Sequence, residues 1–559
     1  MHVAILRPRR APDQARVGGA GDDGPVLLAE VAATSTAVAA TRARLAKRAL
    51  LVATLRRAAA EGPDEVGLVA RYLAGELRQR RTGLGWRGLA SMPPPADEPS
   101  LTVTGMDRAF EAMAAMSGPG SAGAREAAAA ALFGAAITEE QRFLRGLVVG
   151  ELRQGALDAL LLDAVAEAAG VAPELVRRAA MLAGDSAAVA VAALASDEPV
   201  AALSGIGLTV GRPVRPMLAQ SAPDVTAAFT AVGAGAAGLA VVDVKLDGIR
   251  IQVHREGDDV RVFTRSLDDI TARVPEIVGI ARSMPGERFV LDGEALALDA
   301  TGRARPFQET SSRAATRGAG PAGRGFATSD AELAGSAALT PFFFDVLHAD
   351  GRDLLDEPLL DRLAVLDRIA AGHTVDRLVT ADVTAAQERF TTWVAAGQEG
   401  VIVKSPVAPY AAGRRGAGWV KVKPRHTLDL VVLAVERGSG RRVGTLSNIH
   451  LGARDPAGGF VMLGKTFKGM TDEMLAWQTQ RFTELATSDD GWVVTVRPVQ
   501  VVEIAFDGVQ RSSRYPGGVA LRFARVLRYR DDKRPDEADT IDAVRALAAP
   551  APGEDESEG

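Results

Sequence analysis

The region from about residue 26 to 205 carries hydrophobic residues at helical spacing. Its clearest stripe follows the i, i+3, i+4, i+7 pattern of a buried helix face and consists of Leu157, Leu160, Leu161, Ala164, Val165 and Ala168. The string GELRQ occurs twice in this region, at 75–79 and 150–154, each time next to apolar helical sequence. The pattern predicts an all-helical domain over 26–205, built from repeated helix pairs.

The pattern changes after the connector GRPVRPMLA, at 211–219, whose proline and glycine content is typical of an extended linker. Short apolar runs at VVDVK, IRIQVHR and VRVFTR predict a strand followed by a hairpin, which turns at EGDD. Further strands are predicted at FVLDGEALAL, PFFFDVL, GVIVKS and WVKVK, with helices such as LLDRLAVLDRIA between them. We therefore expect an α/β domain over 206–424, with a mobile loop from Arg313 to Leu339.

Beyond Pro424, several short alternating runs are separated by turn residues, from LDLVVLAVE to VALRFARVLRYR. So many short strands favour a small closed β-barrel over 425–540. The ends lack any hydrophobic period: residues 1–25 are rich in Gly, Pro, Asp and Arg, and 541–559 finish in the acidic string EDESEG. Both ends are predicted to be disordered.

Composition and charge narrow the class of protein. No run of about eighteen apolar residues occurs and the chain has no cysteine, so we expect a cytoplasmic protein without a membrane partner or disulfides. The net charge of -5 averages over faces of opposite sign, because basic residues gather at Arg42–Arg57 and again at Arg511–Arg534. Such clusters are compatible with binding to a nucleic acid, despite the negative net charge.

The string KLDGIR, from Lys245 to Arg250, offers a candidate nucleophile. A lysine amine attacks phosphorus only when neutral, so its pKa must fall from about 10.4 through desolvation or nearby cations. Lys421 and Lys423 in WVKVKP lie at i and i+2 of a predicted strand and so share one face. They could grip a phosphate beside Lys245, or they could be solvated lysines on an edge strand.

Several ordered strings together resemble the motifs of ATP-dependent DNA ligases. They are KLDGIR, FTRSLDD, LDGEALA, PFFFDVL, EGVIVKSP, WVKVKP and RFARVLRYRDDK. The segment RFLRGLVVGELRQGALDALLLDAV resembles the helical DNA-binding domain of larger cellular ligases, which makes Arg153 a candidate DNA contact. The resemblance implies an all-α DNA-binding domain, an α/β nucleotidyltransferase (ATP-grasp-like) adenylation domain and a C-terminal β-barrel of the OB-fold type.

The resemblance also implies roles for individual residues. Lys245 would attack the α-phosphate of ATP and hold AMP, while Asp247, Glu294 and Glu399 would bind Mg²⁺, with Mn²⁺ as a substitute. Residues around the nucleotide would be Asp243, Arg250, Arg265, Glu294, Phe344, Lys404, Lys421, Lys423, Arg522 and Lys533. Arg265 would also contact the 5′-phosphate of the nick. Surface carboxylates, strand-face arginines and a solvated basic face are the structural alternatives, and core packing could explain two of Phe342, Phe343 and Phe344.

The expected substrates are ATP and nicked double-stranded DNA, and the expected state is a monomer. The helical region argues against an RNA ligase or a capping enzyme, and the lack of cysteine argues against an NAD-dependent ligase, which carries a four-cysteine zinc module. A non-catalytic nucleic-acid scaffold remains the alternative from a different class. A hinge near Pro424 is predicted to let the C-terminal domain approach and leave the nucleotide.

Overall fold

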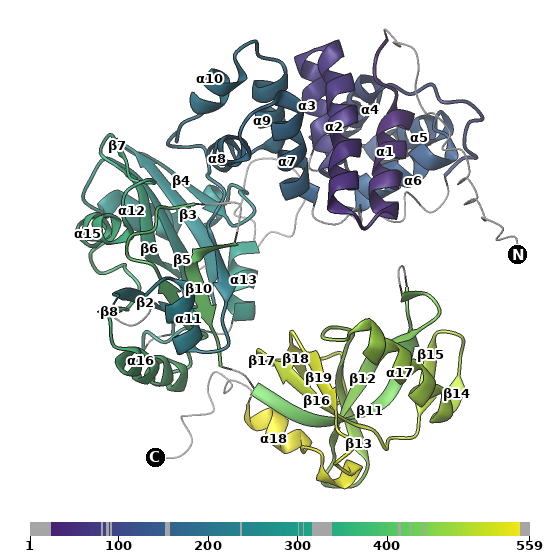
Figure 1. Ribbon diagram of the computed structural model, residues 1–559, viewed down its shortest axis with the longest axis vertical. Helices are drawn as coiled ribbons and strands as arrows, with labels where there is room; N and C mark the ends of the chain where they lie inside the picture. Colours follow the sequence, from purple (N-terminus) through teal and green to yellow (C-terminus); the bar gives the residue numbers. More distant parts are fainter. Residues whose placement is uncertain are drawn as a thin grey trace, which may run out of the picture. The chain divides into compact units, whose positions relative to one another are not determined.

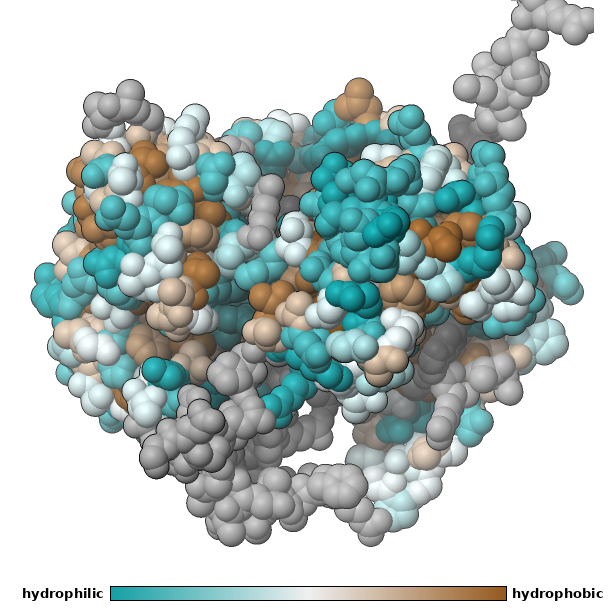
Figure 2. Space-filling view, turned by 90° about the horizontal axis from the view of Figure 1, so that it is seen from below, coloured by the Kyte–Doolittle hydropathy of each residue, from teal (hydrophilic) through white to brown (hydrophobic). Residues whose placement is uncertain are grey.

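The computed structural model describes residues 24–79, 82–84, 89, 92–150, 152, 157–234, 238–299, 301–305, 307–315, 338–411, 415–424, 426–439 and 442–547. The chain divides into two compact units, Met1–Arg215 and Pro216–Gly559 (Figure 1). Along the described chain, no helix combines the length and apolar character needed to cross a membrane. The face drawn in Figure 2 is mainly hydrophilic, with hydrophobic residues in scattered patches.

The first unit is helical, as predicted. Its helices are α1 (Leu28–Ala40), α2 (Arg44–Glu61), α3 (Pro63–Leu73), α4 (Val103–Ala115), α5 (Ser121–Gly134), α6 (Thr138–Val149), α7 (Leu157–Ala169), α8 (Pro173–Ala183), α9 (Ser186–Leu194) and α10 (Pro199–Ser204). They bury one hydrophobic core. In α7 the middle of the predicted stripe, from Leu160 to Val165, contributes to that core.

The first GELRQ string follows the end of α3, where Gly75 has a positive φ of 79°. Its Arg78 and Gln79 both donate to the carboxylate of Asp107, which also accepts from the hydroxyl of Tyr72 at 2.8 Å. Most of the second copy, including Arg153, lies outside the described residues. Whether the copies are structural repeats therefore stays a prediction.

Residues 216–424, called the two-sheet region below, mix strands and helices as predicted. The strands are β1 (Leu218–Ser221), β2 (Ala240–Lys245), β3 (Ile249–Glu256), β4 (Asp259–Thr264), β5 (Arg288–Ala297), β6 (Leu339–Ala349), β7 (Arg352–Asp353), β8 (Arg377–Thr380), β9 (Gly400–Lys404) and β10 (Arg415–Val422). The helices are α11 (Val225–Ala231), α12 (Pro275–Ser283), α13 (Phe307–Ala315), α15 (Leu359–Ile369) and α16 (Val383–Ala395), with a 3-10 turn η2 (Thr271–Arg273).

These strands form two five-stranded sheets, in the orders β1-β10-β9-β2-β8 and β4-β3-β5-β6-β7. The predicted hairpin is β3 with β4, and the predicted helix at 359–370 is α15. The predicted loop from Arg313 is corrected at its start, because Arg313 belongs to α13 and its guanidinium binds Glu276 at 2.9 Å. The end of that loop is corrected as well, because Leu339 is buried at the start of β6, and residues 316–337 lie outside the described residues.

Residues 426–547, called the C-terminal region below, are rich in strands. The strands are β11 (His426–Arg437), β12 (Leu446–Arg454), β13 (Phe460–Thr466), β14 (Ala486–Asp489), β15 (Val493–Val496), β16 (Val501–Phe506), β17 (Gly508–Arg511), β18 (Val519–Arg522) and β19 (Arg525–Tyr529). The helices are α17 (Asp472–Glu484) and α18 (Ile541–Ala546), with a 3-10 turn η4 (Pro535–Glu537).

In the C-terminal region, seven strands form a sheet in which β11 pairs with β12, β15 and β16, and β16 also pairs with β19. The pairings among the described strands do not close into a barrel, so an OB-fold stays a prediction. The predicted disordered tail is corrected at its start: α18 buries Ile541 and Val544 in the core of this region.

Candidate active site

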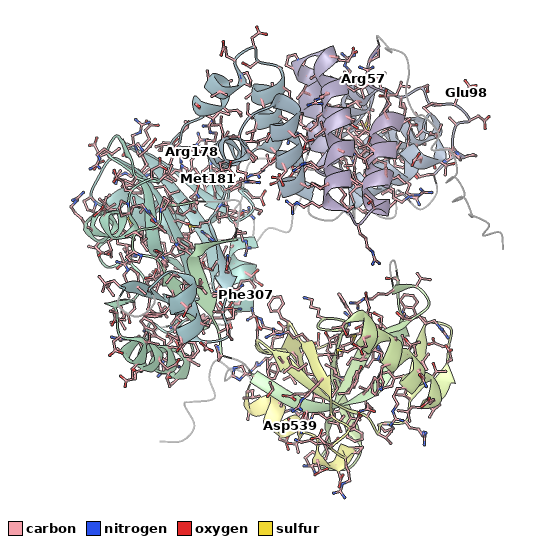
Figure 3. The ribbon with its side chains drawn as sticks, in the orientation of Figure 1. Arg57, Glu98, Arg178, Met181, Phe307 and Asp539 are labelled. Atoms are coloured by element: carbon pink, nitrogen blue, oxygen red, sulfur yellow. The ribbon has the colours of Figure 1, made fainter. Side chains whose placement is uncertain are left out.

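A pocket of about 440 Å³ is lined by residues from both sheets of the two-sheet region and by Arg522 and Phe523 of the C-terminal region. Phe307 of α13, labelled in Figure 3, also lines it. Lys245 stands at the end of β2, where the strand delivers its side chain into the pocket. Most of the residues predicted around the nucleotide meet here.

Glu399 links the predicted nucleophile to a second lysine. One of its carboxylate oxygens pairs with the ammonium of Lys245, and the other pairs with Lys423. The backbone fixes this arrangement, because the amide of Glu399 donates to the carbonyl of Lys245 at 3.0 Å. The next residue, Gly400, has a φ of 140°, and a Cβ there would lie 2.2 Å from the carbonyl oxygen of Val422. This close approach requires glycine.

Lys421 and Lys423 both line the pocket, as their spacing predicts. The alternative of an edge strand does not hold for β10, which pairs with β1 on one side and β9 on the other. Burial lowers the pKa of Lys423, but Glu399 and Asp507 outweigh it and hold that pKa above its usual value. Lys423 therefore remains a cation, suited to binding a phosphate.

Glu294 projects from β5 beside these groups. Burial raises its pKa from 4.5 to about 7, and the nearby cations Lys245 and Arg250 oppose that rise. A carboxyl group with a pKa near neutrality can change its protonation with small changes in surroundings. Binding of a metal cation would favour its ionised form.

Arg250 does not point freely into the pocket. Its guanidinium binds Asp292 through two bonds of 3.1 and 2.7 Å and the carbonyl of Met217 at 2.6 Å. Asp292 also accepts from the hydroxyl of Tyr410 at 2.7 Å. Burial alone would lower the pKa of Arg250, but Asp292 raises it above the usual value. These bonds hold the guanidinium of Arg250 in one orientation at the wall of the pocket.

One end of the pocket combines aromatic rings with a buried ion pair. The ammonium of Lys404 lies 4.5 Å from the centroid of the Trp419 ring and 5.0 Å from that of Phe344. It also donates to the carbonyl of Phe344 at 3.0 Å and lies 2.5 Å from the carboxylate of Asp243. Lys404 thus lines the pocket, as expected of a residue around the nucleotide, and within it lies beside the aromatic residues.

The three phenylalanines of β6 have different places. Phe343 is fully buried in the core of the β4-β3-β5-β6-β7 sheet. Phe342 and Phe344 face the other way, and of the three only Phe344 lines the pocket. Its ring meets Trp419 edge to face at 5.7 Å. Phe344 is thus the member of the run available to a bound base.

The two predicted residues of the terminal motif are separated. Arg522 lines the pocket and binds Asp247 with a shortest bond of 2.7 Å. Lys533 instead pairs with Asp429 at 2.6 Å and lines a different hollow, beside Trp477 of α17. The structure thus does not bring Lys533 to Lys245: the residue follows β19 and lines the other hollow.

The three predicted metal ligands line the same pocket, but they differ in their present partners. Glu294 and Glu399 line one pocket together with Asp247, but Asp247 is bound by Arg522. Within the described part of the chain, no group of three or more acidic or histidine side chains is arranged to hold a metal ion by itself. The residues fit a hard cation that takes part of its ligands from substrate phosphates.

Arg265, just after β4, lines the pocket and is exposed, so it is available to a ligand. Sequence reasoning missed other residues of the site, above all Trp419, Asp292 and Tyr410. Trp419 and Asp292 stand inside the strings WVKVKP and LDGEALA, so those strings were the available signal. Tyr410 stands outside every string, and only the fold shows its contact with Asp292.

Comparisons with known proteins agree with this geometry. The chain matches the family models described as "ATP dependent DNA ligase domain" over residues 216–423 and "ATP dependent DNA ligase C terminal region" over 442–533. A "Probable DNA ligase" of Beutenbergia cavernae is 69% identical over 526 residues, covering 94% of this chain and 100% of that relative. A "Probable DNA ligase" of a Nocardioides species is 61% identical, with coverage of 94% and 99%.

A solved structure described as "Pmar-Lig_PreS3" has a TM-score of 0.57 at 17% identity, covering 89% of this chain and 99% of that chain. That likeness concerns the fold alone. The matched family models and the near full-length relatives establish the relationship by sequence. The chain belongs to the family of ATP-dependent DNA ligases.

Proposed function

We propose that this ligase seals nicks in duplex DNA through a covalent lysyl-AMP intermediate on Lys245. The observation that carries the proposal is the pocket in which Lys245 meets Glu399, Lys423 and Lys421, with Glu294 beside them. A lysine nucleophile, several cations for phosphates and two acids form the set that phosphoryl transfer needs.

In the first step the Nζ atom of Lys245 attacks the α-phosphorus of ATP, forming a P–N bond as pyrophosphate leaves. Lys245 must lose a proton before it attacks, and the contacting carboxylate of Glu399 is placed to accept it. Lys421 and Lys423 then neutralise the charge that develops on the phosphate. Since Glu399 holds both Lys245 and Lys423, an incoming phosphate has to replace one of its contacts.

The aromatic end of the pocket is proposed to hold the adenine. Phe344 offers a ring for stacking, and the carboxylate of Asp243 can accept a hydrogen bond from the 6-amino group. Lys404 supplies a donor beside that carboxylate. The proposed position of the base thus follows from the aromatic pair Phe344 and Trp419, not from the phosphate-binding lysines.

Glu294 and Glu399, with Asp247 once it is released by Arg522, are the residues that would hold Mg²⁺ or Mn²⁺. Such a cation, when bound, supplies a positive charge that stabilises the transferring phosphate. Because burial raises the pKa of Glu294 to about 7, this acid is partly protonated near neutrality in the protein alone.

The later steps take place on DNA. An oxygen of the 5′-phosphate attacks the phosphorus of the lysyl-AMP and releases Lys245, and the 3′-hydroxyl then attacks the activated 5′-phosphate and releases AMP. Arg265 is proposed to bind the 5′-phosphate with its planar guanidinium. The helical unit is proposed to grip the DNA through backbone phosphates, with affinity that falls steeply with salt and hardly depends on sequence.

The C-terminal region is proposed to be an OB-type domain that moves about a hinge near Pro424. Arg522 already lies in the pocket, whereas Lys533 lies outside it, so a rotation is needed before Lys533 could reach a nucleotide. Crosslinking this region to the two-sheet region should block nick sealing. Unimpaired sealing by the crosslinked protein would exclude the hinge.

We propose that the protein is a cytoplasmic, monomeric enzyme that acts in DNA replication, repair or recombination. Because the protein is proposed to read only the shape and backbone of a nicked duplex, each of these processes would present it with the same substrate.

The covalent step gives the direct test. The protein is incubated with ATP labelled at the α-phosphate and Mg²⁺, and the labelled adduct is measured on a denaturing gel. We expect an adduct with the wild-type chain and with Lys465→Ala, whose side chain does not line the pocket, and none with Lys245→Ala. A wild-type chain that forms no adduct would support the scaffold alternative.

A further inference from the structure

Arg377 does not line the pocket, but it contacts the pocket residue Asp243. We infer that Arg377 is a positioning residue that orients the carboxylate of Asp243 toward the 6-amino group of the nucleotide base. The inference rests on the proposed function, because it assumes that Asp243 contacts the base. It adds a residue that decides how well the enzyme distinguishes ATP from triphosphates without that amino group.

The two residues are direct neighbours across two strands. Arg377 begins β8, which pairs antiparallel with β2, and the register places it opposite Asp243. Opposite residues of an antiparallel pair project on the same side of the sheet. The Nε atom of Arg377 accordingly donates to Oδ1 of Asp243 at 3.2 Å.

A second acid holds Arg377 in place from the other side. Its Nη1 atom donates to both carboxylate oxygens of Asp367, on α15, at 3.1 and 3.2 Å. The side chain of Asp367 is 56% exposed, whereas that of Arg377 is 11% exposed and that of Asp243 only 2%. Arg377 thus ties the buried carboxylate to an anchor at the surface.

The buried carboxylate has two cationic partners with different geometry. Lys404 approaches Oδ2 of Asp243, but it is a point charge on a flexible chain and also donates to the carbonyl of Phe344. Arg377 is planar and holds Oδ1 in a defined direction. Because an aspartate side chain has little reach from β2, the direction of its lone pairs decides whether a base amino group can bind.

The pairing of Arg377 is not what stability alone would select. Its Nη2 atom is buried and has no hydrogen-bond partner among the described residues. A buried donor without a partner costs stability, so groups kept only for structure are usually fully paired. An effect on Asp243 would explain why this cost is tolerated at Arg377.

The experiment compares ATP with purine riboside 5′-triphosphate, which lacks only the 6-amino group. Single-turnover rates of adduct formation with Mg²⁺ are measured over a range of triphosphate concentrations, and the ratio of the two specificity constants is taken. For the wild-type chain we expect a preference for ATP of about 10- to 100-fold, the worth of one hydrogen bond to a charged group. The ratio does not depend on the fraction of active protein, which separates it from a folding defect.

Arg377→Met should reduce this preference by about fivefold or more, mainly through weaker binding of ATP, with little change for the analogue. Arg377→Lys keeps the charge without the planar geometry, so its preference for ATP should lie between those of the wild-type chain and Arg377→Met. Asp367→Asn removes the surface anchor and should give a smaller reduction. Arg352→Met changes an arginine that is 72% exposed, pairs with Glu357 and does not contact Asp243, so it should keep the wild-type ratio.

An unchanged ratio in Arg377→Met, with a discriminating wild-type chain, overturns the inference and leaves the proposed function intact. Equal use of both triphosphates by the wild-type chain also overturns it, because Asp243 then does not read the amino group. A wild-type chain that forms an adduct with neither triphosphate instead refutes the proposed function itself.

Discussion

Each unit of the chain contains a buried tyrosine whose hydroxyl donates to an aspartate that is also bound by an arginine. In the helical unit these residues are Tyr72, Asp107 and Arg78, called the helical cluster below. The carboxylate of Asp107 accepts from Tyr72 at 2.8 Å and from Arg78 at 2.7 Å. The side chain of Arg78 is 46% exposed and also reaches Glu111. Water can therefore replace much of the hydrogen bonding that Arg78 obtains from Asp107 and Glu111.

The pocket cluster of Tyr410, Asp292 and Arg250 has almost the same bond lengths, 2.7 Å from the tyrosine and 2.7 Å for the shorter arginine bond. Here the side chain of Asp292 is 1% exposed and that of Arg250 is 15% exposed. Burial and Asp292 together raise the pKa of Tyr410 well above its usual value. Burial also raises the pKa of Tyr72, so the two clusters differ chiefly in the exposure of the arginine and the aspartate. We therefore expect the residues of the more buried cluster to depend more strongly on one another.

The largest difference between the clusters is expected for loss of the aspartate in the pocket. Asp292→Ala leaves the guanidinium of Arg250 buried without its charged partner, which costs about 3–5 kcal/mol of stability. Chemical denaturation followed by circular dichroism measures this, and labelled adduct formation should be lost as well. Asp292→Asn, which keeps the shape, serves as the matched variant. A loss below about 1 kcal/mol for the alanine variant would contradict the assignment.

A smaller effect is expected for Tyr410→Phe. The change leaves the buried amide of Met217 without its acceptor, at a cost of about 1–3 kcal/mol, whereas the oxygen of Asp292 that accepts from Tyr410 keeps its bond from Arg250. The same denaturation assay measures it. The matched change in the helical cluster, Tyr72→Phe, affects one acceptor that keeps its arginine and glutamine donors, and should cost less. Equal losses for the two phenylalanine variants would remove the distinction between the clusters.

Next comes Asp107→Ala in the helical cluster, with an expected loss of about 1–2 kcal/mol, because Arg78 can turn toward water while the Tyr72 hydroxyl stays buried. Adduct formation at Lys245 should be unchanged, since Asp107 belongs to the other unit. Thermal unfolding and the labelled-ATP assay are measured on the same preparation. A lost adduct would show that the helical unit influences the first step.

The last prediction concerns the pH dependence of stability, which should have opposite sign for Glu294 and for Asp107. Burial raises the pKa of Glu294 from 4.5 to about 7, so its contribution to stability is complete below pH 4.5 and is lost as the pH rises through 7. Glu294→Gln cannot ionise, so its stability relative to the wild-type chain should increase as the pH rises from 4.5 to 7. Urea unfolding between pH 4 and 8 measures the difference. A constant difference over this range would show that the pKa of Glu294 is not raised.

Asp107 gives the opposite sign. Burial would raise its pKa, but bonds from Arg78, Gln79 and Tyr72 outweigh this and lower it. Its contribution is therefore present above the ordinary pKa of an aspartate and is lost as the pH falls through the lowered value. The deficit of Asp107→Ala should shrink in acid, whereas the gain of Glu294→Gln should disappear there.

The sequence was sufficient for elements whose signal is local. The apolar runs in VVDVK and IRIQVHR and the stripe in α7 each arise from neighbours within a few residues, and the structure confirms the two strands and the helix that they predict. Lys421 and Lys423 share the pocket for the same reason, because a strand repeats every two residues.

Contacts across long stretches of sequence were not predictable in this way. Lys404 lies at the aromatic end because β9 runs beside β2 and β10, which no local pattern reports. Tyr410 and Arg377 reach the site only through pairing of distant segments. Lys533 was expected at the nucleotide from its motif, but the motif says nothing about the position of the domain that carries it.

Gly400 has a consequence for how this chain tolerates change. Any side chain there would collide with the backbone of Val422 and push β9 away from β10, although position 400 itself carries no reactive group. The displaced strand would take Glu399 out of reach of both lysines. An exchange at 399 changes the contacts of one side chain with Lys245 and Lys423, whereas even an alanine at 400 changes the packing of two strands. In a mutational scan of all positions, Gly400 should therefore be among the least replaceable residues, although it has no side chain and does not line the pocket.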